Sequence, residues 1–469
     1  MKIKQTRTEK IRQLRWKQHL RHVQKREDKK LVAARRNGDV PSSTSKKNQK
    51  AQELSQFRFE SARLTNEFDV LSPSARLTRR EMKPKKVTTF RIPKKFDIYE
   101  NPESVLCCIA RFRLMALNKT TTGIRFIHNS VDTCMPSEAL LGIVAQEINE
   151  HRFKSGSDIA MRGNIYHSSS DTALIENAGI VAELSEGTVM GTSTSSRKDI
   201  FRYEKDNKQF DSASITAEDI KNETAEGCIQ QLSKGLRRLL LKLNDDVAQD
   251  LVMCLGEILD NVNEHCYRTA PTWYVRSYLN TNKKCQRYFE LMVMNVGHSI
   301  AKTFEILPEG SEAKAEAMEY VTRHSHLFSQ EELLTVTALQ GNVSSKKDQQ
   351  ITRGQGTIRL IETFEQISND FVALRGKGKE TKKNEPVMNI ISGHTVIKFD
   401  GKYHSHTVKH PNGEEDVYIP FNKERSLAFP PDKTSVSRMT NAYFPGVMVN
   451  IRIPLNGSTT PLQDDVKGN

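Results

Sequence analysis

Residues 246–268 have the sequence DVAQDLVMCLGEILDNVNEHCYR, in which an apolar and a polar line each recur at helical spacing. The apolar line predicts the buried stripe of a helix and consists of Leu251, Leu255, Ile258 and Val262. The polar line consists of Glu257, Asn261, Glu264 and His265. Burying a carboxylate beside an amide is costly unless both meet a partner, so we interpret the polar line as a candidate site. A solvated helix face is the alternative interpretation.

The segment from Glu257 to His265 resembles the N box of the GHKL ATPase superfamily, which has a Glu followed four residues later by an Asn. One helical turn then separates an amide oxygen from a carboxylate. The resemblance implies that the cofactors are ATP and Mg²⁺, that Asn261 is the metal ligand, and that Glu257 is the catalytic residue that activates water.

The order of the downstream segments extends this resemblance over residues 225–456. Asn295, Gly297 and Ser299 follow a predicted strand at the position of the family's adenine-binding box. Residues 301–353 are at the position of the nucleotide lid. A second glycine box opens a helix, whose first amides would face phosphate, and contains Gly354, Gly356 and Thr357. Lys346 and Arg353 are expected to bind phosphate oxygens.

Strands are predicted at residues 273–279, 288–294, 371–374, 388–391, 394–399 and 446–454. The sequence departs from the family at Asn295, where the family has Asp, and at Ser299 and Ile358, where it has glycines. An amide lacks the charge-assisted bond to adenine, which predicts weaker selection of the base.

The family-like order of these segments makes an ATP-binding regulatory protein the leading hypothesis. The alternatives are a serine/threonine protein kinase of the anti-sigma type and a degenerate, non-catalytic scaffold.

Residues 96–190 resemble a small STAS-like α/β domain. Helices are predicted at residues 104–117 and 137–148 and strands at residues 123–127 and 180–182. Thr133 and Ser137 are expected to cap the second helix, with phosphorylation as the alternative implied by the resemblance. Residues 191–224 are polar and predict a linker.

The basic charge is concentrated in residues 1–95, which contain 28 Lys and Arg but only 9 Asp and Glu, in a chain whose net charge is +14. Such a helical or disordered arm favours nucleic acid, because each phosphate that it neutralises releases a counterion. A solubilising tail and a strap over a neighbouring subunit are the alternatives. Residues 457–469 are expected to form a disordered tail.

The chain of 469 residues has room for several domains, and no apolar run is long enough to span a membrane. Its seven cysteines are odd in number and include no CxxC pair, which indicates reduced thiols and a cytoplasmic protein. We therefore expect a multidomain α/β (α+β) protein. Its C-terminal part would be a Bergerat-type α/β sandwich, with a mixed sheet covered by helices on one face. The expected partners are a nucleotide, nucleic acid and a protein, and homodimerisation is left open.

Overall fold

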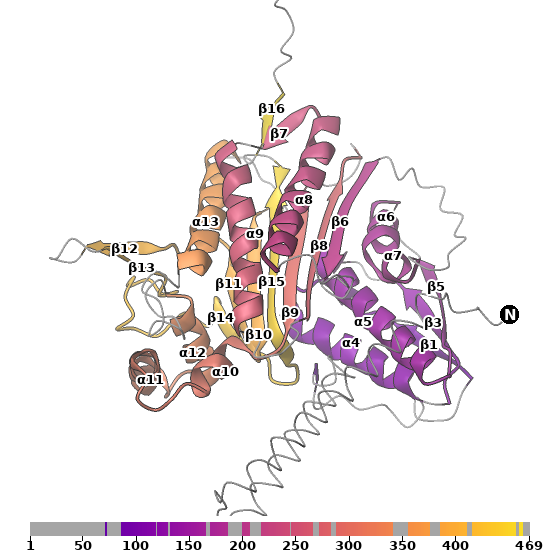
Figure 1. Ribbon diagram of the computed structural model, residues 1–469, viewed down its shortest axis with the longest axis horizontal. Helices are drawn as coiled ribbons and strands as arrows, with labels where there is room; N and C mark the ends of the chain where they lie inside the picture. Colours follow the sequence, from indigo (N-terminus) through magenta and orange to yellow (C-terminus); the bar gives the residue numbers. More distant parts are fainter. Residues whose placement is uncertain are drawn as a thin grey trace, which may run out of the picture. The chain divides into compact units, whose positions relative to one another are not determined.

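The computed structural model describes residues 71–72, 86–118, 120–129, 132–165, 169–185, 199–206, 217–243, 245–265, 272–282, 288–340, 355–375, 385–409, 415–455 and 459–462 (Figure 1). Contacts between residues divide the chain into residues 1–66 and a compact unit of residues 67–469. Most of the expected basic arm lies outside the described residues.

A seven-stranded sheet is the centre of the compact unit. Its strands, in spatial order, are β14 (Val436–Arg438), β11 (Thr395–Phe399), β10 (Val387–Gly393), β15 (Phe444–Pro454), β9 (Tyr288–Val296), β8 (Thr272–Asn280) and β6 (Ile200–Asp206). Every neighbouring pair is antiparallel, so the expectation of a mixed sheet is wrong for this sheet. The strands predicted at residues 273–279, 288–294, 388–391, 394–399 and 446–454 are all present.

Three long helices cover one face of this sheet: α8 (Ala217–Arg238), α9 (Asp245–His265) and α13 (Gln355–Arg375) (Figure 1). Leu251, Leu255 and Leu259 of α9 are buried in one core cluster with Leu291 and Val293 of β9. Of the stripe predicted for α9, Leu251 and Leu255 therefore pack on the sheet and Ile258 is partly buried against the same cluster, whereas the side chain of Val262 lies outside the described residues. The strand expected at residues 371–374 is instead the last part of α13, where the helix simply continues.

The other face of the sheet is also covered, which differs from the expected single helical layer. Its apolar side chains, including Met292, Met294 and Met448, share a core cluster with α4 (Pro102–Leu117) and α5 (Met135–Lys154). Successive side chains of a strand point to opposite faces, so the uninterrupted apolar run of β9 requires cover on both. Residues 96–190 supply helices of this second layer and do not form a separately packed core.

Behind α4 and α5 lies a three-stranded parallel sheet in the order β1 (Val87–Arg91), β3 (Gly123–His128) and β5 (Ala160–Ile165). The chain then forms α6 (Ser169–Ala178) and α7 (Ile180–Ser185). The expectation of a strand at residues 180–182 is wrong, because α7 packs against α5 and buries Glu183.

Residues 300–338 form α10 (Ile300–Glu305), α11 (Glu312–His324) and α12 (Gln330–Ala338). These helices were expected to be part of a nucleotide lid. Phe304, Tyr320 and Leu333 are instead buried in the same core cluster as α9, so this part of the segment is core. Residues 341–353, which complete the expected lid, lie outside the described residues.

Small strand pairs complete the fold: β2 (Lys95–Phe96) with β4 (Asp132–Thr133), β7 (Leu241–Leu243) with β16 (Thr459–Pro461), and β12 (His406–Lys409) with β13 (Glu415–Tyr418). Three elements fall in stretches expected to be arm, linker and tail, namely β1, β6 and β16. None of the described helices is both long and apolar enough to cross a bilayer. The five cysteines in the described ranges form no disulfide.

Candidate nucleotide site and a buried ionic network

Helix α9 carries the expected metal ligand and base on its C-terminal half. The side chains of Glu257 and Asn261 are both partly exposed, whereas the neighbouring Leu255 and Leu259 face the core. The two polar groups therefore lie at the border between core and solvent and are not enclosed in apolar packing. The side chains of Glu264 and His265 lie outside the described residues.

Helices α9 and α13 pack side by side, with Cys254 Sγ 3.6 Å from Thr363 Oγ1. Helix α9 leads into Thr272, which pairs with Val296 at one end of the sheet. Helix α13 leads into Val387, which pairs with Arg452 toward the other end. The two helices thus run antiparallel, and the C-terminal half of α9 lies toward the first turn of α13.

The end of β9 lies on the same side of the sheet as α9. Asn295 is 4% exposed and alternates with Leu291 and Val293 of the helix-covered face, and its carboxamide makes no hydrogen bond with any described residue. The amide of Gly297 donates to Pro445 O at 3.1 Å. Ser299 caps α10, because its hydroxyl accepts from the amide of Lys302. Asn295 is therefore buried and keeps an unused carboxamide within the described structure, whereas Gly297 and Ser299 already have internal roles.

The expected phosphate-binding residues are only partly within the described structure. Lys346, Arg353 and Gly354 lie outside it. Gly356 and Thr357 are in the first turn of α13, and the side chain of Thr357 is partly exposed. Within the described ranges no group of three or more His, Cys, Asp or Glu side chains could hold a metal ion. A cation here would depend on Asn261 and on oxygens of its own ligand.

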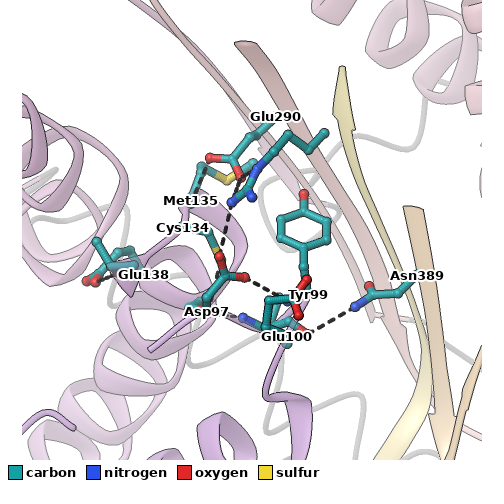
Figure 2. A network of polar contacts seen from close by, with 12 residues as sticks. Asp97, Tyr99, Glu100, Cys134, Met135, Glu138, Glu290 and Asn389 are labelled. Atoms are coloured by element: carbon teal, nitrogen blue, oxygen red, sulfur yellow. Dashed lines mark hydrogen bonds and ion pairs between the residues drawn. The ribbon is translucent and has the colours of Figure 1, made fainter. Parts of the chain in front are cut away.

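A buried ionic network joins the large sheet to the N-terminal layer that covers it (Figure 2). Glu290 of β9 is fully buried, and its Oε1 accepts from Arg452 of β15 at 3.1 Å. Asp97 lies 3.4 Å from the same guanidinium, and the ring of Tyr99 stacks 4.4 Å from it. Burial raises the pKa of the Glu290 carboxyl, an effect that Arg452 and the amide of Met135 oppose.

The network also holds the start of α5. Oε2 of Glu290 accepts from the amide of Met135 at 2.9 Å, so a carboxylate from the sheet satisfies the first turn of this helix. Thr133 and Ser137 do not cap α5, contrary to expectation: Ser137 accepts from the amide of Ile98, and Thr133 donates to Glu138. Ser137 is also fully buried.

A second buried ion pair ties α7 to the sheet. Arg276 of β8 donates to both carboxylate oxygens of Glu183, at 2.5 and 2.9 Å, and lies 3.6 Å from Asp206. The sequence alone did not predict the network of Glu290 and Arg452 or the pair of Glu183 and Arg276. The available signal was a lone charge in an otherwise apolar strand, as at Glu290 in YFELMVMNV and Arg452 in FPGVMVNIRIP.

These networks are enclosed and hold elements together, so the partly exposed region around Asn261 remains the candidate site for a ligand. Comparison of the chain with protein-family models, with curated proteins and with solved structures finds no match in any of the three.

Proposed function

We propose that residues 225–456 bind Mg²⁺-ATP between the C-terminal half of α9, the first turn of α13 and the end of β9. The antiparallel packing of α9 against α13 carries the proposal, because Glu257 and Asn261 then lie toward a helix N-terminus. Free amides and the helix dipole favour phosphate at such a terminus, and carboxamide oxygens suit Mg²⁺.

Each side chain would have a separate task. Asn261 would hold the ion, and Glu257 would orient the attacking water and accept its proton. The carboxamide of Asn295 could both accept from and donate to the edge of a base. When bound, Mg²⁺ would neutralise charge on the phosphates. Thr357 could donate its hydroxyl to a phosphate oxygen.

A non-catalytic nucleotide-binding protein is the second candidate. It is favoured by the internal hydrogen bonds of Gly297 and Ser299, because both groups lie where the resemblance expects contact with the nucleotide. A protein kinase is less favoured as an enzyme acting on its own STAS-like segment, since the hydroxyls of Thr133 and Ser137 are engaged in internal contacts. Its acceptor would have to be another protein.

The proposed consequence of binding is a switch in contacts with a partner. Ligands shift the population of two arrangements only when they bind them with different affinity. Nucleic acid is the partner that the charge of the arm favours.

The direct test is isothermal titration of the full chain with ATP and Mg²⁺. Asn261→Ala should weaken binding about 10- to 100-fold, the value of one hydrogen bond or ligand contact to a charged group. Asn222→Ala is the matched control, because Asn222 is an exposed asparagine of α8 and its loss should leave affinity unchanged. Absence of heat with the unmodified chain would contradict the proposal.

A second experiment separates the activities. With γ-labelled ATP, an ATPase releases free labelled phosphate, and Glu257→Ala should abolish that release while binding persists. Label retained on protein indicates a kinase, and binding without release of label indicates the non-catalytic candidate.

A further inference from the structure

The parallel sheet β1-β3-β5 has one covered and one exposed face. Side chains that point toward α4 and α5 are buried, as Phe90, Ile124 and Phe126 show. Both crossover helices lie on this side, which is expected when consecutive parallel connections have the same hand. The alternate positions of the strands are largely exposed, among them Val87 at 61%.

Three arginines occupy the exposed face. Arg125 of β3 pairs in register with Arg162 of β5, and Arg91 lies on β1 two residues beyond Thr89, the other partner of Arg125. All three are exposed. Neighbouring strands are about 4.8 Å apart and diagonal positions about 7–8 Å apart. The three guanidinium groups can therefore reach one continuous patch.

The charged residues of the three strands are all of one sign. The strands have the sequences VTTFR, GIRFIH and AMRGNI, which contain three arginines and no Asp or Glu. The nearest acidic residues along the chain, Asp132 and Asp158, lie outside these strands. Like charges held this close repel one another, so an anionic partner that approaches the face gains energy.

The composition of the face selects among anionic partners. A second copy of the chain presenting the same face would bring like charges together, which disfavours a symmetric dimer here. No aromatic residue is present at the exposed positions, so bases would find no stacking platform. Guanidinium groups match the geometry of phosphate with paired hydrogen bonds. Closely spaced phosphates on a polymer fit three arginines at these separations.

We propose that the exposed face of β1, β3 and β5 binds the phosphate backbone of nucleic acid through Arg91, Arg125 and Arg162, without selection of base sequence. This surface is separate from the proposed nucleotide site, which lies on the face of the larger sheet that α8, α9 and α13 cover. The proposal does not depend on ATP binding.

The test uses the full chain and fluorescein-labelled 25-residue single-stranded and duplex DNA and RNA, with fluorescence anisotropy measured between about 50 and 200 mM salt. The triple variant Arg91→Gln, Arg125→Gln, Arg162→Gln removes three charges. The matched control, Arg323→Gln, Arg425→Gln, Arg438→Gln, removes three exposed arginines from other elements. This control accounts for the general loss of charge in a chain whose residues 1–95 are also basic.

For the best-bound probe, the sheet-face variant should bind at least about tenfold more weakly near 100 mM salt, and its slope of log affinity against log salt should fall by about 2 to 3. The control should stay within about twofold of the unmodified chain. Replacing the same three sheet-face arginines by lysine should preserve the slope, which separates charge from damage to the fold.

Three outcomes would overturn the proposal. The first is that the sheet-face and control variants have equal affinity and slope. The second is that the unmodified chain binds none of the probes. The third is that polyglutamate of the same charge displaces the nucleic acid equally well, which would assign the face to acidic proteins.

Discussion

Removing the charge of Glu183 should destabilise the fold, because Arg276 would remain buried without its main counter-charge. The exposed fractions of the two side chains are 5% and 7%. Arg276 donates to both oxygens of Glu183 and, through Nη1, to Lys205 O at 3.0 Å. Burial alone would lower the pKa of the Arg276 guanidinium, but Glu183 and Asp206 raise it above the ordinary arginine value, so the group stays charged.

The expected cost of Glu183→Gln follows from what remains around the guanidinium. The substitution keeps the shape and one acceptor oxygen but removes the negative charge. Removing one partner of a buried pair costs about 3–5 kcal/mol, and Asp206, 3.6 Å away, offsets part of that loss. We therefore expect about 3 kcal/mol. The matched control is Glu319→Gln, whose exposed pair with Arg323 is worth at most about 0.5 kcal/mol.

Urea-induced unfolding at pH 7, followed by circular dichroism, measures both variants. In a double-mutant cycle, Glu183→Gln combined with Arg276→Met should cost at least about 2 kcal/mol less than the sum of the single costs, because the orphaned charge is gone. The reasoning is refuted if Glu183→Gln is no worse than Glu319→Gln, or if the two single costs simply add.

Three further predictions concern a partly exposed carboxylate and two glycines. Lys402 and its neighbours hold the pKa of Asp432 well below its usual range, so the stability advantage over Asp432→Asn, followed by thermal melting, should be complete above about pH 4 and disappear as pH falls through the depressed pKa. Gly446→Ala should cost more than about 3 kcal/mol in urea unfolding, because φ is 132° and a Cβ would overlap the carbonyl oxygen of Asn295. Gly256→Ala, where a Cβ meets nothing within 4 Å, should instead stabilise α9 by up to about 1 kcal/mol, and the reverse order of these two effects would contradict both.

The periodicity of hydrophobic residues predicts most helices and strands correctly, and it fails where tertiary contacts override local preference. The run Tyr288–Met294 is apolar at every position except Glu290 and is a central strand, as its composition indicates. Ile180–Val181–Ala182 has β-branched residues that favour a strand, yet it lies in helix α7, which packs against α5 and carries the Glu183 that pairs with Arg276. The strand propensity of three residues is therefore weaker evidence of secondary structure than the tertiary contacts of the segment that contains them.

The layer on the second face of the sheet could not be predicted from spacing alone. Its contacts join residues far apart in the sequence, such as Asp97 with Arg452, 355 positions apart, and Met135 with Glu290, 155 positions apart. The pairing of Glu257 with Asn261 was easier to predict from the sequence. The two residues are one helical turn apart, so the helix alone places them on the same face. Whether Asn295 lies on the same side of the sheet depends on strand register, which the sequence does not state directly.

Strand β9 links the proposed nucleotide site to the N-terminal layer. Asn295 lies on the face of β9 that α8, α9 and α13 cover. Met292 and Met294 lie on the opposite face and belong to the core cluster that contains α4 and α5. A chain that began near residue 199 would expose that apolar face and the carboxylate of Glu290. Because exposed apolar patches of this kind favour aggregation, we expect such a truncated chain to aggregate without its N-terminal layer. A ligand at Asn295 that displaced β9 would therefore also move Glu290 and change its ion pair with Arg452.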